Sequence, residues 1–93
     1  MKLPFKPTGQ NVQFELSTQP GSQVVVAGTF NRWSLTAHPL KDNPGPGHFK
    51  ASLRIPTGRH EYKFVVNGNW IPDPTCAEQT PDGHGSWNSV LHV

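Results

Sequence analysis

The sequence predicts an all-β fold, a sandwich or barrel of about seven short antiparallel strands. Several short stretches alternate apolar with polar residues, a pattern that buries one face of a strand and leaves the other in water. Turn residues are frequent, since the 93 residues include nine glycines and ten prolines. Because these residues interrupt every stretch long enough to hold a helix, no helical periodicity is present in the sequence.

The expected strands share this alternation or a run of β-branched residues, which favour extended backbone. In the first, Val12, Phe14 and Leu16 alternate with polar residues, and the second contains three consecutive valines. The expected strands lie within residues 12–16, 22–27, 49–55, 61–66 and 90–93.

The turn chemistry places the strands relative to one another. Asn67-Gly68 is the strongest hairpin signal, because both residues tolerate the positive φ of a type I′ turn. This turn is expected to fold Trp70 back beside the strand that carries Lys63. Pro72 and Pro74 lack backbone donors, so the segment after Trp70 is at most an edge strand.

Length and charge limit the possible classes of function. The chain predicts one domain over residues 10–93, preceded by a flexible arm or linker remnant at residues 1–9. The net charge is +2 and the basic residues are scattered, which argues against nucleic acid. No apolar run approaches the ~20 residues that span a bilayer, and a single cysteine, Cys76, favours the cytoplasm.

The three tryptophans are the most informative side chains. Trp33 and Trp70 lie in polar, turn-like surroundings, where each could be partly buried packing or an exposed binding surface. Trp87 has the same strand parity as Leu91 and Val93, which favours a packing role, and the alternative is a third stacking surface.

Exposed indoles suit sugars, because the C–H face of a sugar ring lies flat on an aromatic ring while its hydroxyls need donors and acceptors at the rim. Lys63 lies on the outward parity of its strand, opposite to Tyr62 and Phe64, and Asn88 lies opposite in parity to Leu91. Two rings flanked by this lysine and asparagine would form a shallow sugar platform. Taken alone, Lys63 is more often a solvated surface residue.

Six motifs occur along the chain in the same order as in a known family. The motifs are Ala27-Gly28-Thr29-Phe30-Asn31-Arg32-Trp33, His38-Pro39-Leu40, Gly47-His48-Phe49, the stretch from Pro56 to Trp70, Asp73-Pro74, and residues 85–93. Over roughly residues 10–93 the chain resembles the family 48 carbohydrate-binding modules, or isoamylase early-set domains. Among them it looks most like the glycogen-binding domain of AMP-activated protein kinase β subunits.

The resemblance implies an immunoglobulin-like β-sandwich that binds α-1,4-linked glucans such as glycogen, starch and maltooligosaccharides. It also implies that Trp33 and Trp70 stack on glucose while Lys63 and Asn88 bond its hydroxyls. His84 stands where the kinase domains carry a bulky aliphatic residue, and Ser86 is included with it as a candidate carbohydrate-binding residue.

The sequence favours a binding module over an enzyme. Glycoside hydrolysis needs two carboxylates facing each other in a cleft, and the six Asp and Glu residues form no convincing pair. Asp73 and Asp82 are interpreted as turn formers. The five histidines lack metal-ligand spacing, a Cys76–His84 pair has no orienting third residue, and no cofactor is expected. The alternative is a structural or docking domain that contacts a glucan-active enzyme or a kinase subunit and has little sugar affinity.

Overall fold

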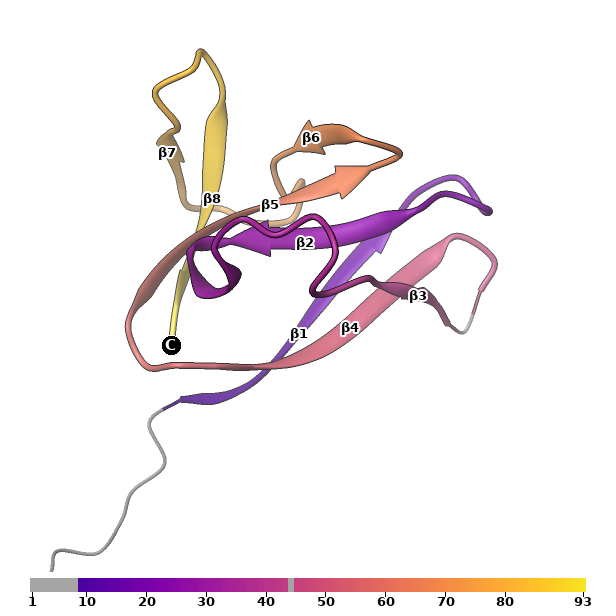
Figure 1. Cartoon of the computed structure of the whole chain (residues 1–93), viewed down its shortest axis with the longest axis horizontal. Helices are drawn as coiled ribbons and strands as arrows, with labels where there is room; N and C mark the ends of the chain where they lie inside the picture. The colour runs from indigo at the N-terminus through magenta and orange to yellow at the C-terminus, as the bar shows by residue number, and fades with distance from the viewer. Residues whose placement is uncertain (1–8, 44) are drawn as a thin grey trace, which may run out of the picture.

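The computed structural model describes residues 9–43 and 45–93, which form two antiparallel sheets packed face to face (Figure 1). One sheet has the strand order β1-β4-β3, and the other has the order β2-β5-β8-β7, with β6 also paired to β5. The strands are β1 (Gln10–Ser17), β2 (Val24–Gly28), β3 (Lys41–Asp42), β4 (His48–Ile55), β5 (Arg59–Val66), β6 (Asn69–Ile71), β7 (Gln79–Pro81) and β8 (Trp87–His92). The predicted all-β sandwich is confirmed. Within the described ranges the one helical element is a 3-10 turn, η1 (Thr29–Asn31). The expected arm lies outside these ranges apart from Gly9.

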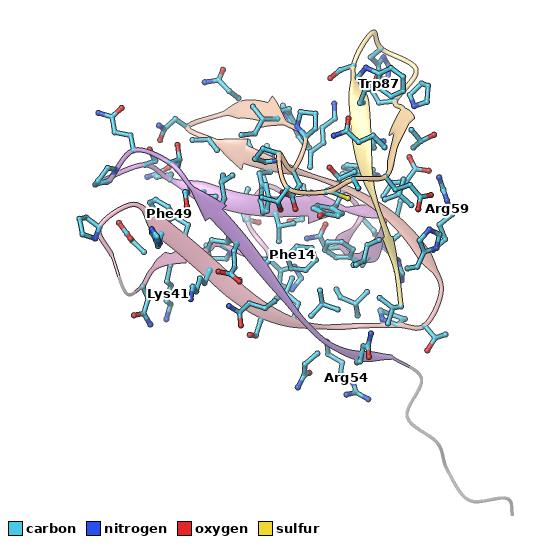
Figure 2. All side chains as sticks on the ribbon, turned by 180° about the vertical axis from the view of Figure 1, so that it is seen from behind. Phe14, Lys41, Phe49, Arg54, Arg59 and Trp87 are labelled. Carbon is cyan, nitrogen blue, oxygen red and sulfur yellow. The ribbon has the colours of Figure 1, made fainter. Side chains whose placement is uncertain are left out.

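The core lies between the two sheets, where the alternation of the strands places their apolar side chains. Phe14 lies between the layers (Figure 2) and meets the ring of Tyr62 edge-on, with 5.1 Å between ring centroids. The β1–β4 register sets Leu16 opposite Phe49, so both strands turn their apolar faces inward. The buried core consists of Phe14, Leu16, Val24, Val26, Leu40, Phe49, Ile55, Tyr62 and Phe64. Burial of such apolar area is the main force that holds a domain of this size together.

The hairpin predicted at Asn67-Gly68 is confirmed. Both residues have positive φ, 50° and 84°, as a type I′ turn requires. The turn joins β5 to β6 and sets Trp70 opposite Val65. Because side chains two residues apart share a strand face, Trp70 lies on the same side of the sheet as Lys63.

β5 has two different neighbours along one of its edges. β2 pairs with residues 62–66 of β5, whereas β8 pairs with residues 59–62 and β6 with residues 64–66. A strand has only two edges, so β6 and β8 share the edge opposite to β2. The two strands diverge at Lys63, which pairs with neither.

A buried polar network spans the gap between β6 and β8. The Tyr62 hydroxyl donates to Asp73 Oδ2 at 2.6 Å, and the Asp73 backbone N–H donates to the Ser89 hydroxyl at 2.8 Å. The other Asp73 oxygen accepts from the backbone and hydroxyl of Thr75. Burial, followed by the hydrogen bond to Asp73, raises the pKa of Tyr62 far above its ordinary value. Asp73 is thus the predicted turn former and also links two strands that do not pair.

Candidate ligand-binding pocket

A pocket of about 510 Å³ opens on the outer face of the second sheet, where β6 and β8 diverge. We call it the tryptophan pocket. Its lining residues are Trp33, Lys63, Trp70, Asp82, His84 and Asn88. Five of the six predicted site residues are therefore brought together. The sixth, Ser86, does not line the pocket, although its backbone N–H donates to Asp82 at 3.1 Å.

Trp33 is presented by a short loop that follows η1. Arg32 and Trp33 both have φ of 57°, so two consecutive residues adopt the left-handed conformation, which costs energy for residues other than glycine. The Trp33 N–H donates to the Gly28 carbonyl at 2.9 Å. The surrounding hydrogen bonds must hold this loop in place, because its backbone alone would not favour it.

The Asn31 side chain supplies most of these hydrogen bonds. Its Oδ1 accepts from the backbone N–H groups of Gly28 (3.0 Å) and Ser34 (3.3 Å). Its Nδ2 donates to the Val26 carbonyl (3.0 Å) and to His38 Nδ1 (2.9 Å). All four hydrogen bonds are consistent with a single orientation of the Asn31 amide. Because two of them reach Val26 and Gly28, they fix the loop that carries Trp33 to β2.

The two indoles form one wall of the pocket. The ring centroids of Trp33 and Trp70 are 6.3 Å apart, and the ring planes meet at 49°. Trp33 is half-buried and Trp70 is 43% exposed. Both rings therefore reach solvent, and of the two possibilities left open by the sequence the structure favours the exposed surface.

Lys63 forms the floor of the pocket and is not a solvated surface residue. Its ammonium donates to Asp82 Oδ2 at 2.6 Å, and the two side chains are only 8% and 10% exposed. The interpretation of Lys63 as solvated is wrong, because Asp82 of the β7–β8 loop pairs with its ammonium and the side chain is buried.

Asp82 is a lining residue that the sequence did not indicate as part of the site. It has the predicted turn role, since Oδ1 accepts from the backbone N–H groups of His84 (2.7 Å) and Ser86 (3.1 Å). The Lys63 hydrogen bond, followed by the one from the His84 backbone, lowers the pKa of Asp82 to about 2. The only sequence signal was an Asp-Gly turn, which does not show that the lysine 19 residues earlier would face it.

Asn88 is held by a carboxylate in a similar way. It is buried, and its Nδ2 donates to Glu61 Oε1 at 2.9 Å. The other Glu61 oxygen accepts from Arg59 at 2.8 Å. The hydrogen bonds from Asn88 and then Arg59 hold the pKa of Glu61 below its ordinary value. The amide plane of Asn88 is thereby set, with its remaining N–H and its Oδ1 free to face a ligand.

Trp87 does not have the packing role that its parity indicated. It is 50% exposed and lies near the end of the β7–β8 hairpin, which projects beyond the first sheet (Figure 2). Its side chain has the core parity, but the opposite layer does not reach this far. The prediction is wrong because parity gives the direction of a side chain and not what covers it.

The chemistry of the pocket suits an uncharged, ring-shaped ligand. It offers two aromatic faces, an amide, and one positive and one negative charge that are paired with each other. Among the residues that the structure describes, no group of three or more His, Cys, Asp or Glu is placed to share a metal ion. No helix in those ranges has the length and hydropathy to cross a bilayer.

Comparisons with known proteins identify a family and several relatives. A family profile described as the glycogen recognition site of AMP-activated protein kinase matches residues 10–93. The chain is 36% identical over 76 residues to the 5'-AMP-activated protein kinase subunit beta-2 of Mus musculus, covering 82% of this chain and 27% of that protein. It is 40% identical over 76 residues to the subunit beta-1 of Sus scrofa (82% and 58%) and of Rattus norvegicus (82% and 26%). The chain thus spans about a quarter of the length of most of these relatives.

Proposed function

The chain belongs to the family of glycogen recognition domains of AMP-activated protein kinase, and on that premise we propose that its tryptophan pocket binds α-1,4-linked glucans. Membership makes it a carbohydrate-binding module whose family is described by glycogen recognition. The proposal concerns the residues: Trp33 and Trp70 stack on glucose, while Lys63 and Asn88 bond its hydroxyls.

The tilt of the two indoles is the observation that carries this assignment. Successive glucose rings of an α-1,4 chain turn relative to one another, so the chain curves, whereas a β-1,4 chain is a flat ribbon. The two indole planes meet at 49° and the ring centroids are 6.3 Å apart. Both indoles can therefore stack on successive glucose rings of a curved chain, whereas only one indole could lie flat on a flat chain. The geometry therefore favours α-linked over β-linked glucan.

The polar groups complete the grip on the sugar. An ammonium has three N–H donors, of which Lys63 gives one to Asp82 and keeps two for hydroxyls. Asn88 keeps one N–H and its carbonyl oxygen. His84 is exposed at the rim, and we assign it a contact there. Ser86 remains a predicted contact, although it does not line the pocket.

The binding experiment is calorimetry of the 93-residue chain with maltoheptaose, β-cyclodextrin and cellohexaose. A shallow pocket with two stacking rings predicts a Kd between about 1 μM and 1 mM for the first two ligands. Cellohexaose should give no measurable heat at the same concentrations. Equal binding of α- and β-linked ligands would show that the tilt of the indoles does not select the linkage.

Absence of catalysis by this chain is a separate part of the proposal. The pocket contains one carboxylate, Asp82, and that group is paired with Lys63, so the second carboxylate needed for glycoside hydrolysis is lacking among the lining residues. Incubation with soluble starch should release no reducing sugar. Release that disappears in an Asp82→Asn variant would contradict the proposal.

Association with a kinase complex is the second candidate function, because the relatives are named as subunits of a protein kinase. Under this candidate the domain joins a glucan to a kinase, and an intracellular location follows, with which the single thiol of Cys76 is compatible. Purified kinase catalytic subunit should be retained by the immobilised domain, with or without maltoheptaose. If the kinase were no longer retained once maltoheptaose is added, the domain and the kinase would instead be bridged by a glucan chain.

A further inference from the structure

The charges in the tryptophan pocket cancel. Among its lining residues Lys63 carries the one permanent positive charge and Asp82 the one negative charge, 2.6 Å apart. His84 also lines the pocket but is exposed at the rim. Glu61, which holds the Asn88 side chain, pairs with Arg59 at 2.8 Å.

The ion pair has a consequence for the kind of glucan that fits. A lone ammonium at the bottom of a pocket would attract anions, and phosphate above all, since it accepts charge-assisted hydrogen bonds strongly. With Asp82 paired to it at 2.6 Å, an anion that approaches the ammonium also approaches a carboxylate. Neutral hydroxyls gain instead, because they can accept from the ammonium and donate to the carboxylate.

We propose that Asp82 is a specificity-determining residue that makes the tryptophan pocket select uncharged glucan segments over segments that carry phosphate esters. The proposal rests on glucan binding by this pocket. Asp82 acts on Lys63 by neutralising its charge, and it acts on a phosphate ester by direct repulsion.

The local structure permits a clean test, because the turn role of Asp82 does not need its charge. Asp82 Oδ1 accepts from the His84 and Ser86 backbone, which the carbonyl oxygen of an asparagine also does. Asp82→Asn thus keeps the turn while leaving the charge of Lys63 unbalanced. Asp42 offers a control for the loss of one carboxylate charge, since it lies on β3 of the other sheet and does not line the pocket. Its two oxygens accept from the backbone N–H groups of Gly47 (2.8 Å) and His48 (3.0 Å), so Asp42→Asn gives up one of these hydrogen bonds.

The experiment compares maltoheptaose with maltoheptaose bearing one 6-phosphate group, titrated into the chain and its variants at low and at physiological salt. The unmodified chain should bind the neutral ligand several-fold more tightly. Asp82→Asn should shift the ratio of the two Kd values toward the phosphorylated ligand by about three- to tenfold, as one unscreened charge at this range would. Asp42→Asn should leave the ratio unchanged.

The outcomes separate this proposal from the one on which it rests. Absence of binding by the unmodified chain to either ligand would overturn the proposed function. Binding of both with an equal ratio in the unmodified chain and in Asp82→Asn would overturn the role of Asp82 alone. In a Lys63→Met/Asp82→Asn variant the ratio of the two Kd values should return to that of the unmodified chain. If the variant kept the improved binding of the phosphorylated ligand, Lys63 would not be the source of that improvement.

Discussion

The hydroxyl of Tyr62 donates a 2.6 Å hydrogen bond to Oδ2 of Asp73 inside the sandwich. Removing it by Tyr62→Phe keeps the ring packed against Phe14 but leaves a buried carboxylate oxygen without its donor. We expect the free energy of unfolding to fall by about 1–3 kcal/mol, measured by urea denaturation. In an Asp73→Asn background the same change should cost less. Equal costs in the two backgrounds would mean that the hydrogen bond contributes nothing.

The stacking role of the indoles predicts different effects for the three tryptophans. Trp33→Ala and Trp70→Ala should each weaken binding of maltoheptaose by about 1–3 kcal/mol, or roughly 5- to 150-fold, as aromatic anchors do. Trp87→Ala is the matched control, because this indole is as exposed but does not line the pocket. Calorimetry supplies the Kd values. Weakening by Trp87→Ala as large as by Trp70→Ala would place the binding surface elsewhere.

The amide of Asn31 predicts that the loop carrying Trp33 is sensitive to a change of one atom. Asn31→Asp keeps the acceptor for Gly28 and Ser34 but sets an oxygen against the Val26 carbonyl in place of a donor. Unfolding free energy should fall by about 1–3 kcal/mol, and glucan affinity should fall with it. Asn67→Asp is the control, since its Oδ1 bond to Gln23 persists and its exposed Nδ2 bond is dispensable.

The lowered pKa values of Asp82 and Glu61 predict loss of stability in acid. A carboxyl whose pKa is lower in the folded state stabilises it above the unfolded pKa and loses that contribution as pH falls through the folded pKa. Denaturation midpoints should therefore be level above about pH 5 and decline between about pH 4 and 2. Asp82→Asn should show a shallower decline. An identical decline in both chains would show that the ion pair with Lys63 does not stabilise the fold.

Local patterns were sufficient to predict most of the fold. Alternation located β1, β4 and β5, and the chemistry of Asn67-Gly68 located the hairpin that brings Trp70 beside the strand of Lys63. The boundaries of the strands were predicted less accurately. β8 begins at Trp87 rather than near residue 90, because its first residues pair with β7 although no apolar alternation marks them.

The site residues that were predicted are those that parity and resemblance assign one at a time. The residues that were missed are those whose role depends on contact with a residue distant in the sequence. Trp33, Lys63, Trp70 and Asn88 were assigned in that way and converge in one pocket. The carboxylates that hold the polar groups, Asp82 for Lys63 and Glu61 for Asn88, come from other strands or loops. Such partners follow from tertiary packing, which a pattern along one strand does not contain.

β5 presents Tyr62 and Phe64 to the interior and Lys63 to the tryptophan pocket on the outer face. A shift of its pairing by a single residue would exchange these two sets of side chains, setting a phenylalanine at the bottom of the pocket and an ammonium among the core rings. Retention on immobilised amylose is therefore a sensitive assay for correctly folded material, since misaligned molecules would pass through the column.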